Sequence, residues 1–184
     1  MDIGAVYLKD VLRMYRNYKA LGEGAFAQVR SDADLQTLID PDANSIAVIV
    51  KHVAGNLRSR FRDFLTADGE KPDRDRDGEF EVSETVSRHE IMTWWNEGWA
   101  VAMEALESLT PADLDRTIYI RGEAFLVVEA LNRSITHTAY HVGQIITLAR
   151  HVLGSQWRTL SIPKGRSKSI TGDFKTRECS RSNK

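Results

Sequence analysis

The chain has 184 residues and a mass of 20.8 kDa, enough for one domain that buries a hydrophobic core without disulfide bonds or a structural metal. Its 42% hydrophobic and 28% charged residues are typical of a globular protein, and no apolar run reaches the roughly 20 residues of a membrane span. Cys179 is the single cysteine, and the N-terminus lacks the basic start and apolar run of a signal peptide. We therefore expect a cytoplasmic protein without a membrane partner.

The formal net charge of −1 is divided unevenly along the chain. Residues 1–153 carry 17 Lys and Arg against 24 Asp and Glu, a charge of −7, whereas residues 154–184 carry 8 against 2, a charge of +6. This division predicts a bundle domain over 1–153 and a basic C-terminal extension over 154–184, packed at first and disordered at its end. The extension could contact phosphates, but the acidic domain argues against nucleic acid as a partner.

Hydrophobic residues recur at spacings of three and four in four long segments, and strict alternation is nearly absent, so an all-α fold is predicted. The first helix is expected over residues 5–29, with two glycines weakening its second half. The second helix is expected to begin at residues 41–45, where acidic and amide side chains can cap it, and to continue through Phe64.

A third helix is expected to open at residues 83–85 and carries three tryptophans. Trp95 and Trp99 lie four apart on its apolar stripe, which favours a place in the core over ligand stacking. The segment Thr110-Pro111-Ala112-Asp113 combines an N-cap, a helix-start proline and an acidic third position, and so predicts a short helical turn. Residues 118–120 are then expected to be extended.

The fourth helix is expected from about Glu123 to Leu153, with Gly154 as its stop. Helices of about 23 to 31 residues would measure on the order of 35 to 45 Å, and such matched lengths favour a four-helix bundle. The connections that flank the third helix are each about 15 residues, longer than an up-down bundle requires, which favours long crossover connections.

The fourth helix contains the sequence His137-Thr138-Ala139-Tyr140-His141. Histidines four apart lie on one helix face, so both imidazoles can reach one divalent ion at roughly 2.0–2.1 Å. The alternative is a solvated pair, or a pair at the edge of the core, which the same spacing also allows.

His52 adds weight to the metal interpretation because it lies in the middle of the apolar second helix. A buried imidazole needs a partner for its ring nitrogens, and an ion shared with the other pair would satisfy one of them. A core histidine bonded to a hydroxyl or carbonyl is the alternative. His89 lies in a polar run that predicts a solvated side chain, and His151 is about 15 Å beyond His141 along the helix axis, too far to share the ion.

A histidine midway through the second helix, followed by His-x-x-x-His-x-x-Gln in the fourth, resembles the DinB-like (damage-inducible, YfiT-like) superfamily of bacterial metal-binding four-helix bundles. Further stretches resemble one subfamily within it, so that the resemblance covers most of residues 5–170. The stretches are 56–66, 68–72, 76–77, 79–80 and 160–165.

The resemblance implies one divalent cation, zinc or nickel, held by His52, His137 and His141 at the mouth of a pocket. Three imidazoles leave coordination positions open for water or a small-molecule substrate. The resemblance further implies a low-molecular-weight thiol as co-substrate, in a metal-dependent transferase or a related hydrolase. Asn56 and Gln144 are the candidates for contacts to the ligand or to the histidine rings, and interhelical packing is the alternative for both.

No general acid, general base or electrophile pocket is evident in the sequence, so a non-enzymatic function stays open as the alternative. In that alternative the ion only joins the second and fourth helices, and the bundle acts in a stress response or in dimerisation. The second helix is hydrophobic over more than one stripe, which favours a homodimer.

Residues 73–84 match the calcium-loop pattern D-x-D-x-D-G-x5-E, with Gly78 at the sixth position and Glu84 at the twelfth. Gly69 and Pro72 interrupt the helix that should lead into such a loop, and the sequence has no second loop to pair with it. A solvated acidic surface loop is therefore favoured over a calcium site.

Overall fold

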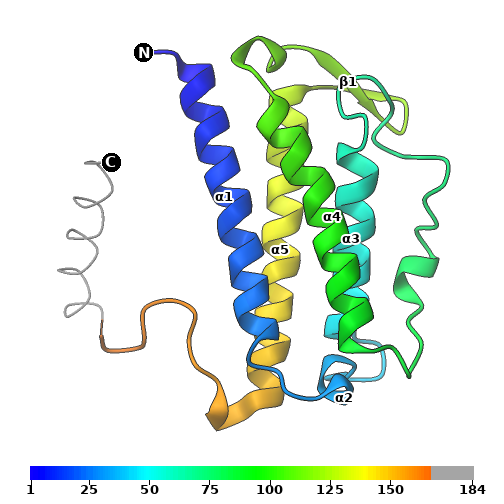
Figure 1. The fold of residues 1–184 in the computed structure, drawn as a ribbon, viewed down its shortest axis with the longest axis vertical. Helices are drawn as coiled ribbons and strands as arrows, with labels where there is room; N and C mark the ends of the chain where they lie inside the picture. The colour runs from blue at the N-terminus through cyan, green and yellow to red at the C-terminus, as the bar shows by residue number, and fades with distance from the viewer. Residues whose placement is uncertain (167–184) are drawn as a thin grey trace.

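A computed structural model describes residues 1–166 of the chain. Four long helices lie side by side in a bundle, which confirms the predicted all-α class (Figure 1). They are α1 (Ile3–Phe26), α3 (Ile46–Phe61), α4 (Arg88–Ser108) and α5 (Val127–Leu153), with a single-turn helix, α2 (Asp32–Leu35), after α1. No helix among these described residues is both long and apolar enough to cross a membrane.

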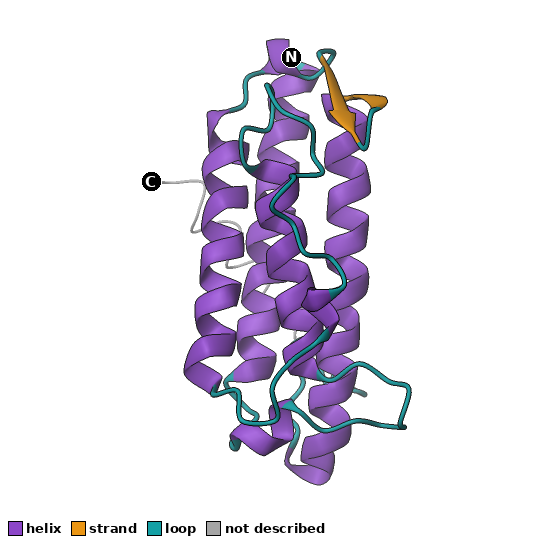
Figure 2. Cartoon of the chain, turned by 90° about the vertical axis from the view of Figure 1, so that its right-hand side faces the viewer, coloured by secondary structure: helices purple, strands orange, loops and turns teal. Residues whose placement is uncertain are grey.

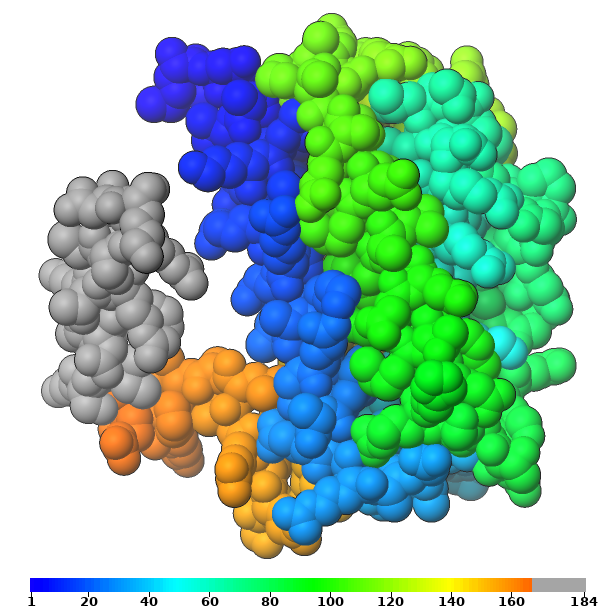
Figure 3. All heavy atoms as spheres, viewed as in Figure 1, coloured from blue at the N-terminus to red at the C-terminus, as the bar shows by residue number. Residues whose placement is uncertain are grey.

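The connection between α3 and α4 runs the length of the bundle. In Figure 1, α1 and α5 descend while α3 and α4 both ascend, so residues 62–87 must return along the outside of the bundle. This segment contains a single 3-10 turn, η1 (Gly78–Phe80), and covers one side of the molecule in the space-filling view (Figure 3). The crossover thereby places a loop against the middle of α3.

Side-chain caps set where α3 and α4 begin. Ser45 Oγ accepts a hydrogen bond from the backbone N–H of Val48, and Ser87 and Glu90 form a reciprocal capping box. The predicted continuation of the second helix through Phe64 is wrong, because α3 ends at Phe61 and Asp63 adopts a left-handed φ of 50°. The first helix also ends earlier than expected, at Phe26.

A small antiparallel hairpin closes the end of the bundle at which α5 begins (Figure 2). Strand β1 (Thr117–Ile120) pairs with β2 (Glu123–Leu126), and the turn residues Arg121 and Gly122 both have positive φ, 58° and 74°. The prediction that the fourth helix starts at Glu123 is wrong, because residues 123–126 pair with β1 instead. The short turn predicted before the hairpin is confirmed as η2 (Pro111–Asp113).

Aromatic side chains fill the core between α1, α3 and α4. Trp95 and Trp99 are fully buried, as predicted, and their rings make edge contacts with Phe26 and Tyr15 at centroid distances of 5.1 and 6.0 Å. Gly22 in α1 lies against Trp95, since a Cβ at that position would be 2.6 Å from the indole ring. One of the two glycines that weaken the helical pattern is therefore the residue that makes room for the large side chain.

The chain continues past α5 through a 3-10 turn, η3 (Gly154–Gln156), and returns to α1. There Arg158 N–H donates to Gln28 Oε1 at 2.8 Å, and Gln28 Nε2 donates to the Arg158 carbonyl at 3.0 Å. The disorder predicted for the end of the extension falls on residues 167–184, which lie outside the described residues.

Candidate metal centre

His52, His137 and His141, predicted as metal ligands, come together between α3 and α5. His137 Nε2 lies 3.3 Å from His52 Nε2 and 3.2 Å from His141 Nε2, and one ligand atom from each residue lies within 4.8 Å of the others. Nitrogens bound to one ion at about 2.0–2.1 Å would be separated by roughly 2.9–3.4 Å at octahedral or tetrahedral angles. The two separations that involve His137 are in that range, and the three rings form a group that could hold one divalent cation.

Hydrogen bonds on the far side of the rings fix which nitrogens face the cluster. His52 Nδ1 lies 2.9 Å from Glu79 Oε2, and His141 Nδ1 lies 2.8 Å from Gln144 Oε1. Both partners accept, so each Nδ1 carries the hydrogen, and in the neutral ring the Nε2 presents a lone pair. One hydrogen on His137 Nε2 can serve only one of the two facing lone pairs, whereas a cation would serve all three nitrogens.

The surroundings keep the α5 histidines in the uncharged form that ligation requires. Burial lowers the pKa of His137 to about 3, and the proximity of His141 and His52 adds to the shift. Burial also lowers the pKa of His141, against the opposing effect of its hydrogen bond with Gln144. Both rings are therefore neutral at pH 7.

Glu79 is the functional candidate that the sequence did not single out. It lies in η1 on the crossover segment and is only 6% exposed, and Arg74 donates to its two oxygens from Nε at 2.7 Å and from Nη2 at 2.8 Å. Burial alone would raise the pKa of Glu79, but the hydrogen bonds from Arg74 and His52 outweigh it and keep the pKa below its ordinary value. A carboxylate that orients a ligating histidine in this way is common around metal sites.

A glycine in α3 makes room for this carboxylate. A Cβ at Gly55 would overlap the Glu79 carboxylate, so a larger residue there would displace it. Glycine inside a helix costs about 1 kcal/mol relative to alanine, which makes its presence in the middle of α3 informative. It is the signal in the sequence that could have pointed to a group packed against this turn.

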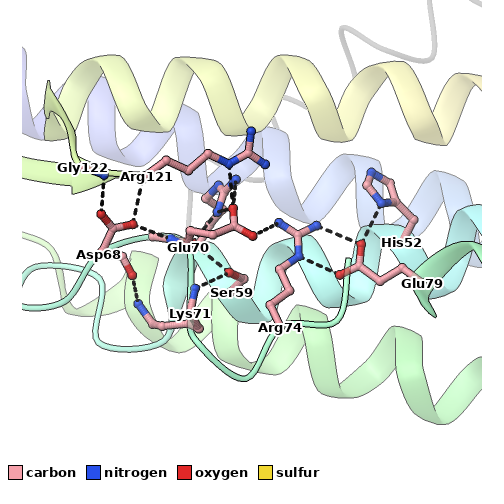
Figure 4. Close-up of polar contacts among 11 residues, drawn as sticks. His52, Ser59, Asp68, Glu70, Lys71, Arg74, Glu79, Arg121 and Gly122 are labelled. Carbon is pink, nitrogen blue, oxygen red and sulfur yellow. Dashed lines mark hydrogen bonds and ion pairs between the residues drawn. The ribbon is translucent and has the colours of Figure 1, made fainter. Parts of the chain in front are cut away.

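Figure 4 shows a chain of polar contacts from the β1–β2 turn to His52. Arg121 Nε donates to Glu70 Oε2 at 3.0 Å, and Glu70 Oε1 lies 3.5 Å from Arg74 Nη1. Arg74 then holds Glu79, which accepts from His52. The crossover segment is thus tied both to the hairpin and to the candidate metal ligand.

The hairpin end of this network is held by one carboxylate. Asp68 accepts the backbone N–H groups of Arg121 and Gly122 at 2.8 and 2.7 Å. These contacts satisfy the donors of the tight turn and fix Arg121 beside Glu70.

A pocket of about 370 Å³ adjoins the cluster, between α3 and α5 and below the hairpin, with His52 and His137 in its wall. Asn56, one of the two predicted contact residues, is buried and lines this pocket one turn from His52. The other, Gln144, lies outside the pocket lining and holds His141, while its own Nε2 donates to the Tyr140 hydroxyl at 3.1 Å. Phe80 covers the His52 ring at a centroid distance of 4.9 Å.

The remaining histidines and the calcium-like loop do not join the centre. His89 is exposed, as expected, and His151 is exposed near the end of α5, ten residues beyond His141. The Asp73 carboxylate accepts a hydrogen bond from the Arg62 guanidinium, and the Asp75 carboxylate accepts one from the Gly78 N–H. Both carboxylates therefore already have partners within the protein. Within residues 1–166, the three-histidine cluster is the only gathering of three or more His, Cys, Asp or Glu side chains suited to an ion.

Fold and site together define a class: a helical bundle with a crossover connection and three histidines gathered beside a pocket. A family model described as "Protein of unknown function (DUF1572)" matches residues 2–166, so the chain belongs to the DUF1572 family. This family is part of the DinB-like superfamily, in agreement with the resemblance seen in the sequence. A search of curated proteins and a search of solved structures each gave no match.

Proposed function

We propose that the protein binds one divalent metal ion, zinc or nickel, through His52, His137 and His141, and acts with it on a small-molecule substrate. The observation that carries the proposal is the convergence of three Nε2 atoms, two of which are fixed as lone-pair donors by their partners on the far side. When bound, such an ion lowers the pKa of a coordinated thiol or water and so supplies a nucleophile near neutral pH. By likeness to the superfamily, that nucleophile is a low-molecular-weight thiol.

The protein's own groups would set the orientation and basicity of the ligands. Glu79 accepts the hydrogen bond from His52 Nδ1–H, which makes Nε2 of the same ring a better lone-pair donor to a metal. Arg74 keeps Glu79 ionised although Glu79 is buried. Gln144 accepts the Nδ1–H of His141 in the same way, with a weaker effect, because an amide oxygen carries no net charge.

The pocket supports a reacting site over a purely structural one. A structural zinc site is closed by four protein ligands, whereas a reacting site leaves positions for substrate. Here three side chains gather, and two of them form part of the wall of a cavity large enough for a small molecule. We therefore favour chemistry over the non-catalytic bundle.

Metal analysis of the purified protein and two variants tests the proposal. We expect about one equivalent of zinc or nickel in the native protein, and its loss in His137→Ala with the helical circular dichroism retained. His89→Ala is the matched control, because His89 is an exposed histidine on α4. Full metal content in His137→Ala would refute the ligand assignment.

A second measurement separates chemistry from structure. The loaded native protein is screened for conjugation of bacterial thiols to model electrophiles, and its melting temperature is recorded with and without a chelator. Conjugation that is lost on chelation supports the transferase. No conjugation together with a large fall in melting temperature would support the non-catalytic bundle, because binding energy would then be folding energy.

A further inference from the structure

We infer that the pocket beside the three histidines takes a small organic anion, whose carboxylate or phosphate group meets the guanidinium groups of Arg76 and Arg133 and whose apolar part lies against the pocket floor. The inference rests on the proposed function in one respect: it names the class of substrate that would reach the metal.

The charged side chains that line the pocket are all arginines. They are Arg60, Arg74, Arg76, Arg121 and Arg133, and no carboxylate is among the lining residues. Residues 1–153 carry a net charge of −7, so five cations around one cavity are an exception to the rest of the domain. A recess lined by one sign of charge focuses the field and attracts the opposite charge.

Three of these arginines are neutralised in part by neighbours behind the pocket wall. Arg60 and Arg121 donate to Glu70, and Arg74 donates to Glu79. The two carboxylates leave an excess of three positive charges around the cavity. The three paired arginines hold the pocket wall in place, and Figure 4 shows this network for Arg74 and Arg121.

Arg76 and Arg133 are different, because within residues 1–166 neither forms an ion pair or a hydrogen bond through its guanidinium group. Arg133 lies over the Phe125 ring at 5.5 Å, which orients it without neutralising it. Both are exposed and both line the cavity, one from the crossover segment and one from α5. Each of these two unpaired guanidinium groups can donate two parallel hydrogen bonds to a pair of oxygens on a carboxylate or a phosphate.

The rest of the lining shows what else the ligand carries. The lining includes Phe61, the last residue of α3, Phe64 in the turn that follows, and Ile118 and Ile120 of β1, and all four are buried. An apolar segment of the ligand would cover this surface. At about 370 Å³ the pocket lies near the lower end of the size range for small-molecule sites, which favours a small molecule over a polymer such as nucleic acid.

The spacing on α5 relates the anion to the proposed metal. Arg133 and His137 are four residues apart and lie on the same helix face, so they are separated by about 6 Å along the axis. A ligand held at Arg133 would therefore extend from its anionic group to the metal within about one helical turn. The anionic group positions the molecule, and the histidine end is left for the reacting atom.

Binding of three aromatic probes tests the inference by calorimetry. Phenylacetate carries the carboxylate, phenyl phosphate the phosphate, and 2-phenylethanol is the uncharged analogue of similar shape. We expect at least one anion to bind at least tenfold more tightly than the alcohol, and the preferred anion to identify the group. The double variant Arg76→Gln, Arg133→Gln should lose that advantage while its affinity for the alcohol is unchanged.

The matched control is Arg150→Gln, because Arg150 is also an exposed arginine on α5 but lies in its last turn, outside the pocket lining. It should bind the anion as the native protein does. Equal affinity for anion and alcohol, or an undiminished anion affinity in the double variant, would overturn the inference. Metal content is measured on the same samples: an anion bound by metal-free protein refutes the proposed function alone, and metal without anion selectivity refutes this inference alone.

Discussion

The two helices that form the candidate metal centre hold their histidines in different ways. On α3, His52 is 5% exposed and its partner Glu79 is buried and held by Arg74. On α5, His137 and His141 are half-buried, and His141 depends on an uncharged amide that also contacts an exposed tyrosine. One side is fixed by a buried ionic chain, and the other by a neutral contact close to solvent.

This difference indicates that the geometry of the site is held more firmly on the α3 side than on the α5 side. Burying a carboxylate and a guanidinium carries a desolvation cost that their attraction does not always recover, and apolar packing of equal volume often stabilises a fold as well. The Arg74–Glu79 pair is therefore poorly explained by stability alone. Its position behind His52 indicates that it fixes one candidate ligand, which would leave the α5 histidines to adjust to an ion.

The largest effect is expected for Glu79→Ala. The substitution removes the acceptor of His52 Nδ1–H and leaves Arg74 buried with only Glu70 nearby, at 3.5 Å. We expect metal affinity to fall on the order of 10- to 100-fold and the free energy of unfolding to fall by about 3 kcal/mol. Chelator competition measures the first quantity, and urea denaturation of the metal-free protein measures the second.

Glu81→Ala is the control for this prediction, since Glu81 is an exposed acid two residues along the same segment. Both quantities should stay within error of the native values in that variant. Native-like metal affinity in Glu79→Ala would mean that the α3 side is no more rigid than the α5 side, and the comparison would fail.

A smaller loss is expected for Gly55→Ala, which changes no ligand and no hydrogen-bonding group. The new methyl group would overlap the Glu79 carboxylate and displace it from His52. We expect metal affinity to fall about tenfold, although alanine is the better helix former. The measurement is again chelator competition.

Gly143→Ala makes the same substitution on α5, where a Cβ would have nothing within 4 Å. It should leave metal affinity unchanged and stabilise the protein by up to about 1 kcal/mol through helix propensity. If both alanine variants bound the ion equally well, the space beside Gly55 would have no part in positioning His52.

The three histidines could be predicted because each signal is local. A spacing of four places two rings on one helix face, and a polar residue within an apolar stripe stands out. The bundle followed from the same periodicity. What could not be predicted is the partner of His52, since Glu79 is 27 residues away and reaches it only because the crossover segment runs back along α3.

Local signals also misled where tertiary contacts decide the structure. Glu79 lies in an acidic stretch that is predicted to be a solvated surface loop, yet its carboxylate is buried and contacts Arg74 and His52. Residues 123–126 continue the apolar pattern of the following helix but pair with β1, because the Arg121-Gly122 turn reverses the chain. Periodicity reports which face is buried and does not report which partner covers it.

The smallest effect is expected for Gln144→Ala, the counterpart of the Glu79 variant on α5. His141 is half-buried close to an exposed tyrosine, so a water molecule can replace the amide oxygen that accepts its Nδ1 hydrogen. No buried charge is left unpaired. We therefore expect metal affinity to fall only about threefold and the free energy of unfolding to change by less than about 0.5 kcal/mol, measured as for Glu79→Ala. A loss as large as that of Glu79→Ala would show that both helices hold their ligands equally firmly, and that solvent near α5 does not substitute for the protein's own hydrogen bonds.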